Sequence, residues 1–147
     1  MENRLYPKEG EVFEMTGDFN VNTPEKLIKV LGRTENCEYE GTPLTGIQTA
    51  KFKLQRAGGF DAGSVRCYIQ KNFGEPARGQ WILVFKENFP FHDNHWSIGC
   101  ADESWRSKSP ANSNGVLVIG TKKGAIHLEY EGDNFSSREY MWLVLVE

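Results

Sequence analysis

Residues Tyr140-Met-Trp-Leu-Val-Leu-Val146 decide the fold, because this segment is apolar on both faces of a strand. A strand that alternates apolar and polar residues has one solvated face, whereas a strand that is apolar throughout is buried on both. We therefore expect residues 140–146 at the centre of a sheet that is covered on both sides. The cover is either a layer of helices or another subunit, so a homo-oligomer is one of the two alternatives.

Two strands upstream of this segment complete a C-terminal three-strand meander. Val116–Ile119 and residues 125–130 lie on either side of Gly120-Thr-Lys-Lys-Gly124. Glycine takes positive φ at low cost, which a tight hairpin turn requires. The two runs are therefore predicted to pair as an antiparallel hairpin, with residues 140–146 as the third strand.

Strand periodicity also marks three segments further upstream. Residues 48–56 are the clearest case, since apolar side chains alternate with polar or basic ones: Ala50, Phe52 and Leu54 against Thr49, Lys51 and Lys53. Shorter strands are predicted at Glu11–Met15 and at Ser97–Ala101. The sheet is expected to be mainly antiparallel.

Helix signals occupy the sequence between these strands. A hydroxyl at Thr23 followed by a proline is typical of a helix start, and apolar residues spaced three and four apart predict a helix over Pro24–Leu31. A second helix is expected in the segment Asp61–Gly74. A third is predicted over Pro76–Asn88 from the spacing of its large apolar residues, although Trp81–Phe85 alone is also compatible with a buried strand.

Length and composition indicate one domain. The 147 residues suffice for a single core, and an apolar fraction of 39% excludes a disordered chain. The longest apolar run covers residues 141–146, far short of the roughly 20 residues that a membrane-spanning helix needs. We therefore predict a single α+β domain over residues 1–147, with two to three helices packed on the sheet and no membrane association.

Global features point to the cytoplasm and away from cofactor chemistry. The first ten residues are polar, unlike a secretory leader, and the three cysteines lack the spacing of a disulfide scaffold or a zinc site. Phosphate-binding loops and the common hydrolase and metal signatures are also missing. We expect free thiols, no cofactor, and a binding function rather than catalysis.

The segment His92-Asp93-Asn94-His95 is the best local candidate for chemistry. Two imidazoles and a carboxylate this close together can bind a metal such as zinc, with Cys100, Asp102 or Glu103 completing the ligand set. The plain alternative is a solvent-exposed loop whose histidines hydrogen-bond water or backbone.

A second candidate is Ala101-Asp-Glu-Ser-Trp-Arg106, which we expect to form a loop after a strand, where scaffolds often carry sites. Asp102 can act as a base and Ser104 as a nucleophile if His95 comes within hydrogen-bonding distance. Alternatively, Asp102 and Ser104 cap the backbone amides of a turn. Both loops together would make a small metal-dependent or hydrolytic enzyme, which is the alternative to a binding protein.

Basic residues concentrate between positions 41 and 74. There Lys51, Lys53 and Arg56 can bind phosphates from one face of a strand, with Phe60 or Tyr68 available to stack on bases. A net charge of −3 disfavours a nucleic-acid-binding module, because such domains are strongly basic as a rule. The same face also suits an acidic protein partner.

Aromatic residues and arginine are the side chains that dominate binding surfaces. Trp96, Trp105 and Arg106 therefore form a second candidate binding set. Trp142, by contrast, is expected to be core because it lies in the doubly apolar segment.

Several fragments resemble segments of small bacterial proteins that have no characterised function. They are Thr45-Gly-Ile-Gln-Thr49, Lys51-Phe-Lys-Leu54, Gly79-Gln-Trp81, Phe85-Lys86, Phe89-Pro90, Gly99-Cys-Ala-Asp-Glu-Ser-Trp105 and Trp142-Leu-Val-Leu-Val-Glu147. In those proteins the counterpart of residues 80–88 is more polar and helical, which favours a helix here. The resemblance implies a bacterial or phage source. It does not point to any particular activity.

Our expectation from the sequence is thus a small cytoplasmic, non-enzymatic binding protein of a bacterium or phage. Its partner would be a protein or a small ligand. An enzyme built on residues 92–95 and 102–106, and a nucleic-acid-binding module built on residues 48–56, are the two alternatives.

Overall fold

The computed structural model describes residues 6–31, 37–39, 42–57, 62–90, 96–107, 113–119, 126–130 and 140–146. Its helices are α1 (Pro24–Leu31), α2 (Ala62–Asn72) and α3 (Trp81–Asn88). Its strands are β1 (Phe13–Asp18), β2 (Cys37–Tyr39), β3 (Ile47–Gln55), β4 (Glu75–Pro76), β5 (Ser97–Ser107), β6 (Ser113–Ile119), β7 (Ile126–Tyr130) and β8 (Tyr140–Leu145). None of the helices in these ranges has the length and apolar character needed to cross a membrane.

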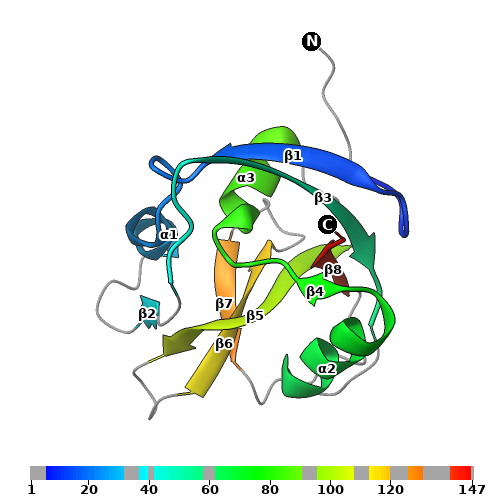
Figure 1. The fold of residues 1–147 in the computed structure, drawn as a ribbon. Coiled ribbons are helices and arrows are strands. Elements are labelled where there is room, and N and C mark those ends of the chain that lie inside the picture. Colours follow the sequence, from blue (N-terminus) through cyan, green and yellow to red (C-terminus); the bar gives the residue numbers. More distant parts are fainter. Residues whose placement is uncertain are drawn as a thin grey trace.

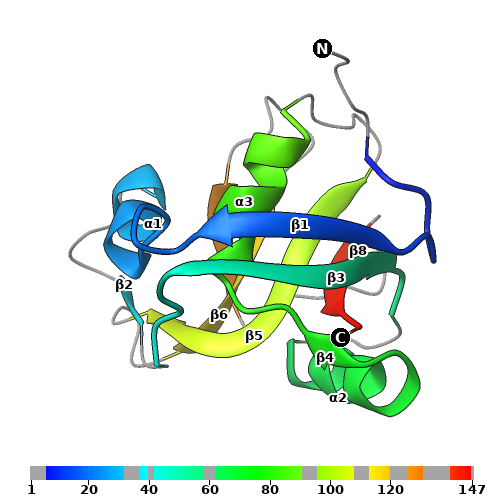
Figure 2. The same ribbon diagram turned by 45° about the horizontal axis from the view of Figure 1, so that its top comes forward.

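The strands form one mixed, curled sheet in the order β1-β3-β8-β5-β6-β7 (Figures 1 and 2). Two short strands lie off this path, since β2 pairs with β5 and β4 pairs with β8. Among the described strands, all pairings are antiparallel except that of β5 with β8. The predicted α+β class, with a mainly antiparallel sheet and three helices, is confirmed.

Strand β8 is buried on both faces, as its sequence predicts. Met141 and Leu143 belong to the larger core cluster together with the residues of α3. Trp142 and Val144 belong to the other cluster, with two residues of α2. Because successive strand residues point to opposite faces, the two helices cover opposite faces of β8. The predicted central position of this strand is confirmed, with β3 and β5 as its neighbours.

The predicted C-terminal meander is wrong in its last step. β6 and β7 do form the predicted antiparallel hairpin, in which Ile119 lies opposite Ile126. β8, however, does not pair with β7 but lies on the other side of β5, parallel to β5 and antiparallel to β3. A strand with two apolar faces is stable where both faces are covered, and that place lies between β3 and β5.

Helices α1 and α2 follow their sequence signals. α1 has the predicted bounds, and the Thr23 Oγ1 accepts the N–H of Lys26 at 3.2 Å, as an N-cap does. α2 packs on the sheet through Val65 and Ile69, both fully buried. The chain then turns at Gly74, whose φ is +151°, and a Cβ there would lie 2.6 Å from the carbonyl oxygen of Leu145.

Helix α3 confirms the helical interpretation of Trp81–Phe85 over the alternative of a strand. All five of these residues are buried, because α3 lies between the β1–β3 pair and the remaining sheet (Figure 1). The helix begins at Trp81 and not at the predicted Pro76. The reason is that Glu75–Pro76 forms β4, which pairs with β8.

A buried hydrogen-bond network fixes the start of α3. Gln80 is fully buried, accepts the N–H of Leu44 at 2.7 Å and donates to the carbonyl oxygen of Asn22 at 2.8 Å. The Asn22 side chain in turn donates to Glu87 and accepts from Lys26, both at 3.0 Å. Buried polar groups need such partners, so this network joins α3 to the start of α1 and to residues 42–45.

Candidate functional site

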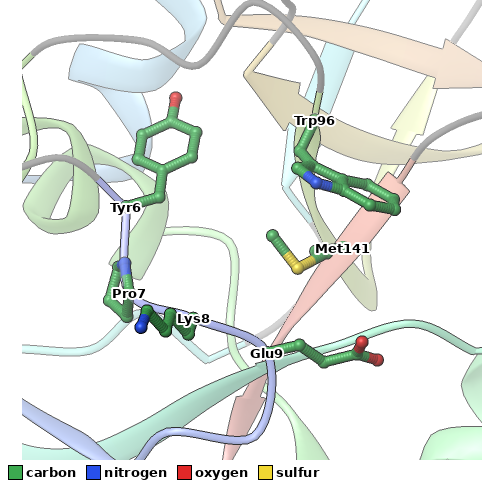
Figure 3. A pocket seen from close by; sticks show the side chains of 6 residues that line it. All are labelled: Tyr6, Pro7, Lys8, Glu9, Trp96 and Met141. Atoms are coloured by element: carbon green, nitrogen blue, oxygen red, sulfur yellow. The ribbon is translucent and has the colours of Figure 1, made fainter.

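A cavity of about 320 Å³ lies at the edge of the sheet where β5 and β8 begin. The described residues that line it are Tyr6, Pro7, Lys8, Glu9, Trp96 and Met141. Because β5 and β8 run parallel, Trp96, which directly precedes β5, and Met141, near the start of β8, reach the same edge. Tyr6 and Trp96 stand on opposite sides of the cavity, with the thioether of Met141 between them (Figure 3).

The wall formed by residues 6–9 continues into a β-turn that fixes it to the sheet. The carbonyl oxygen of Lys8 accepts the N–H of Glu11 at 3.0 Å, and Gly10 at the third turn position has a φ of +81°. Positive φ at this position is typical of a type II turn and favours glycine. The N–H of Gly10 also donates to the carbonyl oxygen of Leu54 at 2.9 Å, so the turn is bonded to the end of β3.

Each aromatic wall is supported by a different part of the protein. The Tyr6 ring packs on Phe85 of α3 and on Phe89 just beyond it, with ring centroids 5.2 Å and 6.5 Å away. The guanidinium of Arg56 lies 5.3 Å from the ring centroid of Trp96, in a cation–π contact. Both rings are therefore held in place by contacts outside the cavity lining.

Arg56 is also bonded to the opposite wall through its backbone. Glu9 lines the cavity, and its Oε2 accepts the N–H of Arg56 at 3.0 Å. Glu9 therefore positions the residue that packs on Trp96. Arg56 itself is not among the described lining residues. The structure thus brings together Arg56 and Trp96, which the sequence offered as members of two unrelated binding sets.

The prediction that Arg56 shares one strand face with Lys51 and Lys53 is wrong. The Lys53 ammonium lies 5.3 Å from the ring centroid of Phe73, which packs on the α2 side of the sheet. Arg56 packs instead on Trp96, which belongs to the α3 side. The reason is the two-residue period of a strand, which places odd and even positions on opposite faces.

The two lysines of β3 belong to a surface distinct from the cavity. Lys51 is exposed and lies directly opposite Glu14 of β1, so a carboxylate offsets part of its charge. Tyr68, which is 42% exposed, packs against Phe73 with ring centroids 5.8 Å apart. Lys53 and Tyr68 are thus brought together through one shared ring, while phosphate binding there stays a prediction.

Residues 102–106 are part of strand β5, so the predicted loop is wrong. Trp105 pairs on one side with Tyr39 of β2 and on the other with Gly115 of β6. The register shifts between Cys100 and Trp105, an irregularity of the β-bulge type, and the strand continues beyond it. The strand therefore extends past the predicted end at residue 101 because its backbone is paired on both sides.

This extension separates Trp96 from Trp105 and Arg106, the other two members of its predicted binding set. Asp102 and Ser104 lie within the strand, and Trp105 follows Trp96 by nine positions of the chain. At about 3.3 Å per residue, that is roughly 30 Å of strand. The structure therefore does not bring Trp105 or Arg106 to the cavity at the start of β5.

The predicted metal ligands His92, Asp93 and His95 lie outside the described residues. Across the described ranges, no group of three His, Cys, Asp or Glu side chains is placed to hold a metal ion. Cys100, one of the proposed accessory ligands, is buried in the core and only 1% exposed. Binding of a metal by residues 92–95 stays a prediction.

Sequence reasoning missed the wall of residues 6–9 and assigned Met141 to the core only. The available signal was the Tyr6-Pro7 pair ahead of Gly10, a composition typical of an extended segment that ends in a turn.

Comparisons of the chain with protein-family models, with curated proteins and with solved structures give no match. The site is therefore interpreted from its own chemistry.

Proposed function

We propose that the protein is a non-enzymatic binding protein and that the cavity between Tyr6 and Trp96 holds a small ligand. The observation that carries this proposal is the arrangement of the Tyr6 and Trp96 rings on either side of the cavity, with the thioether of Met141 between them. Each ring also packs on a residue outside the cavity lining. Rings that pack on fixed partners present a ready-formed slot, and a preformed slot loses little entropy when a ligand enters.

The size and lining of the cavity support a ligand with a flat apolar part. About 320 Å³ falls at the lower end of the range for small-molecule pockets. Two aromatic side chains and a methionine favour contact with another ring, because rings stack on one another and sulfur packs well against ring edges. The floor residue Met141 is only 5% exposed, so a ligand there would be shielded from water on one side.

The charged lining residues suit recognition better than acid–base catalysis. Among the described lining residues only Lys8 and Glu9 carry a charge, and one Glu9 oxygen already accepts the N–H of Arg56. A general base must be within hydrogen-bonding reach of the proton that it removes. The Glu9 carboxylate instead accepts a backbone N–H that holds Arg56 in place. The exposed thiol of Cys67, which forms no disulfide, supports the cytoplasm as the proposed location, because thiols stay reduced there.

The proposal is tested by NMR titration of the labelled protein with indole as a probe. Indole in the cavity should shift the ring N–H signal of Trp96 and the methyl signal of Met141, because both residues line the cavity. The methyl group of Met15, a residue of β1 that is 1% exposed, serves as the reference within the same spectrum and should not move.

Variants separate this cavity from other exposed rings. Trp96→Ala should weaken the binding of indole about tenfold by removing one wall. Tyr68→Ala removes an exposed ring on the α2 side and should leave binding unchanged. If one- and two-ring probes at millimolar concentration leave the Trp96 and Met141 signals in place, the proposed function is wrong.

A further inference from the structure

We propose that the open edge of β1 binds an extended, basic segment of another protein as an additional strand. This inference does not depend on the cavity or on its ligand. It rests on the pairing of β1, on the direction of its backbone groups and on the charges along it.

Strand β1 forms one border of the sheet. It pairs with β3, and no other described strand lies beyond it (Figure 2). Helix α3 covers the face of β1 that carries Phe13 and Met15, whereas Glu14 and Thr16 are exposed. An unpaired edge is a template for a further strand, because an extended segment there gains main-chain hydrogen bonds.

The backbone hydrogen bonds of β1 alternate between its two sides. The N–H of Phe19 donates to the carbonyl oxygen of Gly46 at 2.8 Å, so in the register of β1 and β3 these two residues form a hydrogen-bonded pair. Every second residue of an antiparallel strand forms such a pair. The odd-numbered residues of β1 therefore bond to β3, while the N–H and C=O groups of Glu14 and Thr16 point to the open edge.

This edge is held in an extended conformation before a partner binds. β1 is paired with β3 along its whole length. On one face Phe13 and Met15 are buried in the larger core cluster, and on the other the hydroxyls of Thr16 and Thr49 hydrogen-bond at 2.8 Å. A preformed edge loses little entropy when a strand is added to it.

The charges along β1 favour a basic partner. The strand carries Glu14 and Asp18 and no lysine or arginine. Over the paired residues β3 adds Lys51 opposite Glu14, while Asp18 lies opposite the uncharged Ile47. Asp18 keeps its charge although its Oδ1 accepts the N–H of Asn20. Two carboxylates therefore stand against one ammonium along the paired residues.

Distance strengthens this preference. A strand added to β1 would lie about 4.8 Å from β1 and about twice as far from β3. Glu14 and Asp18 would be its direct cross-strand neighbours, whereas the two lysines of β3 would lie roughly a Debye length away. On the other face α3 carries Lys86 and Glu87, whose charges cancel. The partner is therefore a segment with lysine or arginine at alternate positions.

The same charges disfavour a second copy of this chain as the added strand. Pairing of two β1 edges would bring Glu14 and Asp18 of both copies to one border, and like charges on neighbouring strands are destabilising. An acidic segment is disfavoured for the same reason.

Three short peptides that match the length of β1 test the inference. In them threonine alternates with lysine, with glutamine or with glutamate, so they share a strand-forming pattern and differ in charge. Each is titrated into the full chain and followed by NMR. The lysine peptide should bind most tightly and the glutamate peptide most weakly, with a ratio on the order of tenfold that shrinks as salt is raised.

Amide hydrogen exchange locates the bound peptide. The N–H groups of Glu14 and Thr16 should exchange about tenfold more slowly at a free lysine-peptide concentration about ten times its dissociation constant, because only about a tenth of the edges are then open. The N–H groups of Met15 and Gly17, which bond to β3, serve as the reference and should change little.

Matched variants separate the backbone from the side chains. Thr16→Pro removes the outward N–H, which edge strands tolerate where that group faces solvent, and should weaken binding of the lysine peptide about tenfold. Thr16→Ala also loses the bond to Thr49 but keeps the N–H, so its affinity should stay within about twofold of the unchanged chain. Glu14→Gln should lower the preference for the lysine over the glutamine peptide about threefold. Glu25→Gln, which removes an exposed carboxylate from α1, should leave that preference unchanged.

The outcomes decide between the possible occupants of the edge. Equal affinity for all three peptides, or tightest binding of the glutamate peptide, would overturn the inference of a basic partner. Protection of the Glu14 and Thr16 N–H groups that rises with protein concentration in the absence of peptide would also overturn it, because the added strand would then be a second copy. Lack of protection with every peptide at millimolar concentration, or binding that survives Thr16→Pro, would show that β1 is not the docking edge.

Discussion

Replacement of Gly99 by alanine tests the parallel pairing of β5 with β8 at its closest contact. Gly99 is the register partner of Trp142, and the indole ring lies directly over it. A Cβ at position 99 would lie 2.5 Å from Cζ3 and 2.7 Å from Cε3 of Trp142. Trp142 is 1% exposed in a closed cluster, so its ring has little room to move away.

The magnitude follows from two opposing effects. Glycine within a strand costs about 0.5–1 kcal/mol relative to alanine, so Gly99→Ala would stabilise the protein if the space were open. Non-bonded carbons prefer separations of about 3.5–4.0 Å, so the ring must shift by roughly 1 Å, and such overpacking costs about 1–3 kcal/mol. We expect a net loss of about 1–2 kcal/mol, which for a chain of this length lowers Tm by about 3–6 °C.

The assay is a double-mutant cycle measured by urea unfolding. Trp142→Phe removes the fused ring that meets the new Cβ, so the cost of Gly99→Ala in that background should fall below about 0.5 kcal/mol. The slope of the unfolding free energy against urea should stay the same in all four proteins. A neutral or stabilising effect of Gly99→Ala in the otherwise unchanged chain would refute the close approach and, with it, the register of β5 and β8.

Two further substitutions test the scaffold around the cavity. Gln80→Leu should cost about 2–4 kcal/mol in urea unfolding, because it leaves the Leu44 N–H and the Asn22 carbonyl oxygen without their partner; a loss below 1 kcal/mol would contradict the buried network. Gly10→Ala should cost about 1–2 kcal/mol from positive φ alone, since the nearest atom to its Cβ is 3.5 Å away, and it should weaken indole binding. Gly46→Ala, at φ +71° with open space, is the matched control: it should cost as much in unfolding yet leave binding unchanged, and equal loss of binding in both variants would contradict a specific role for the Gly10 turn.

The sequence predicted those elements whose signals are local. α1 could be bounded because a hydroxyl, a proline and an apolar spacing all lie within a few residues of one another. β3 could be recognised because its two-residue period is unbroken. The start of α3 was placed five residues early, since Pro76 suits a helix start as well as a strand, and the choice depends on β8, which lies far away in the chain.

Pairing between distant segments was beyond the sequence for a physical reason. Hydrophobicity places Tyr140–Leu145 at the centre of a sheet but does not choose its neighbours, because many apolar strands would fit equally well. The assumption that consecutive strands pair gave the meander, whereas the structure inserts β8 between β3 and β5.

The same limit applies to the candidate site. Trp96 and Arg56 were both predicted as binding residues from their chemistry. Their contact depends on where β3 ends and β5 begins, and the period of the strand should have separated Arg56 from Lys51 and Lys53. The wall at Tyr6–Glu9 was missed because an extended polar segment has no periodicity to detect.

The central position of β8 sets an order for folding during synthesis. When the ribosome has made everything up to β7, β3 still lacks one neighbour, and no pairing among the described strands joins the β1–β3 pair to β5, β6 or β7. Phe52 can pair with Leu145, and Gly99 with Trp142, only after β8 has been synthesised. Pairings between such distant residues slow folding and leave strand edges open until they form. The sheet is therefore expected to stay divided until β8 has left the ribosome, and the cavity, whose lining includes Met141, forms only after that moment.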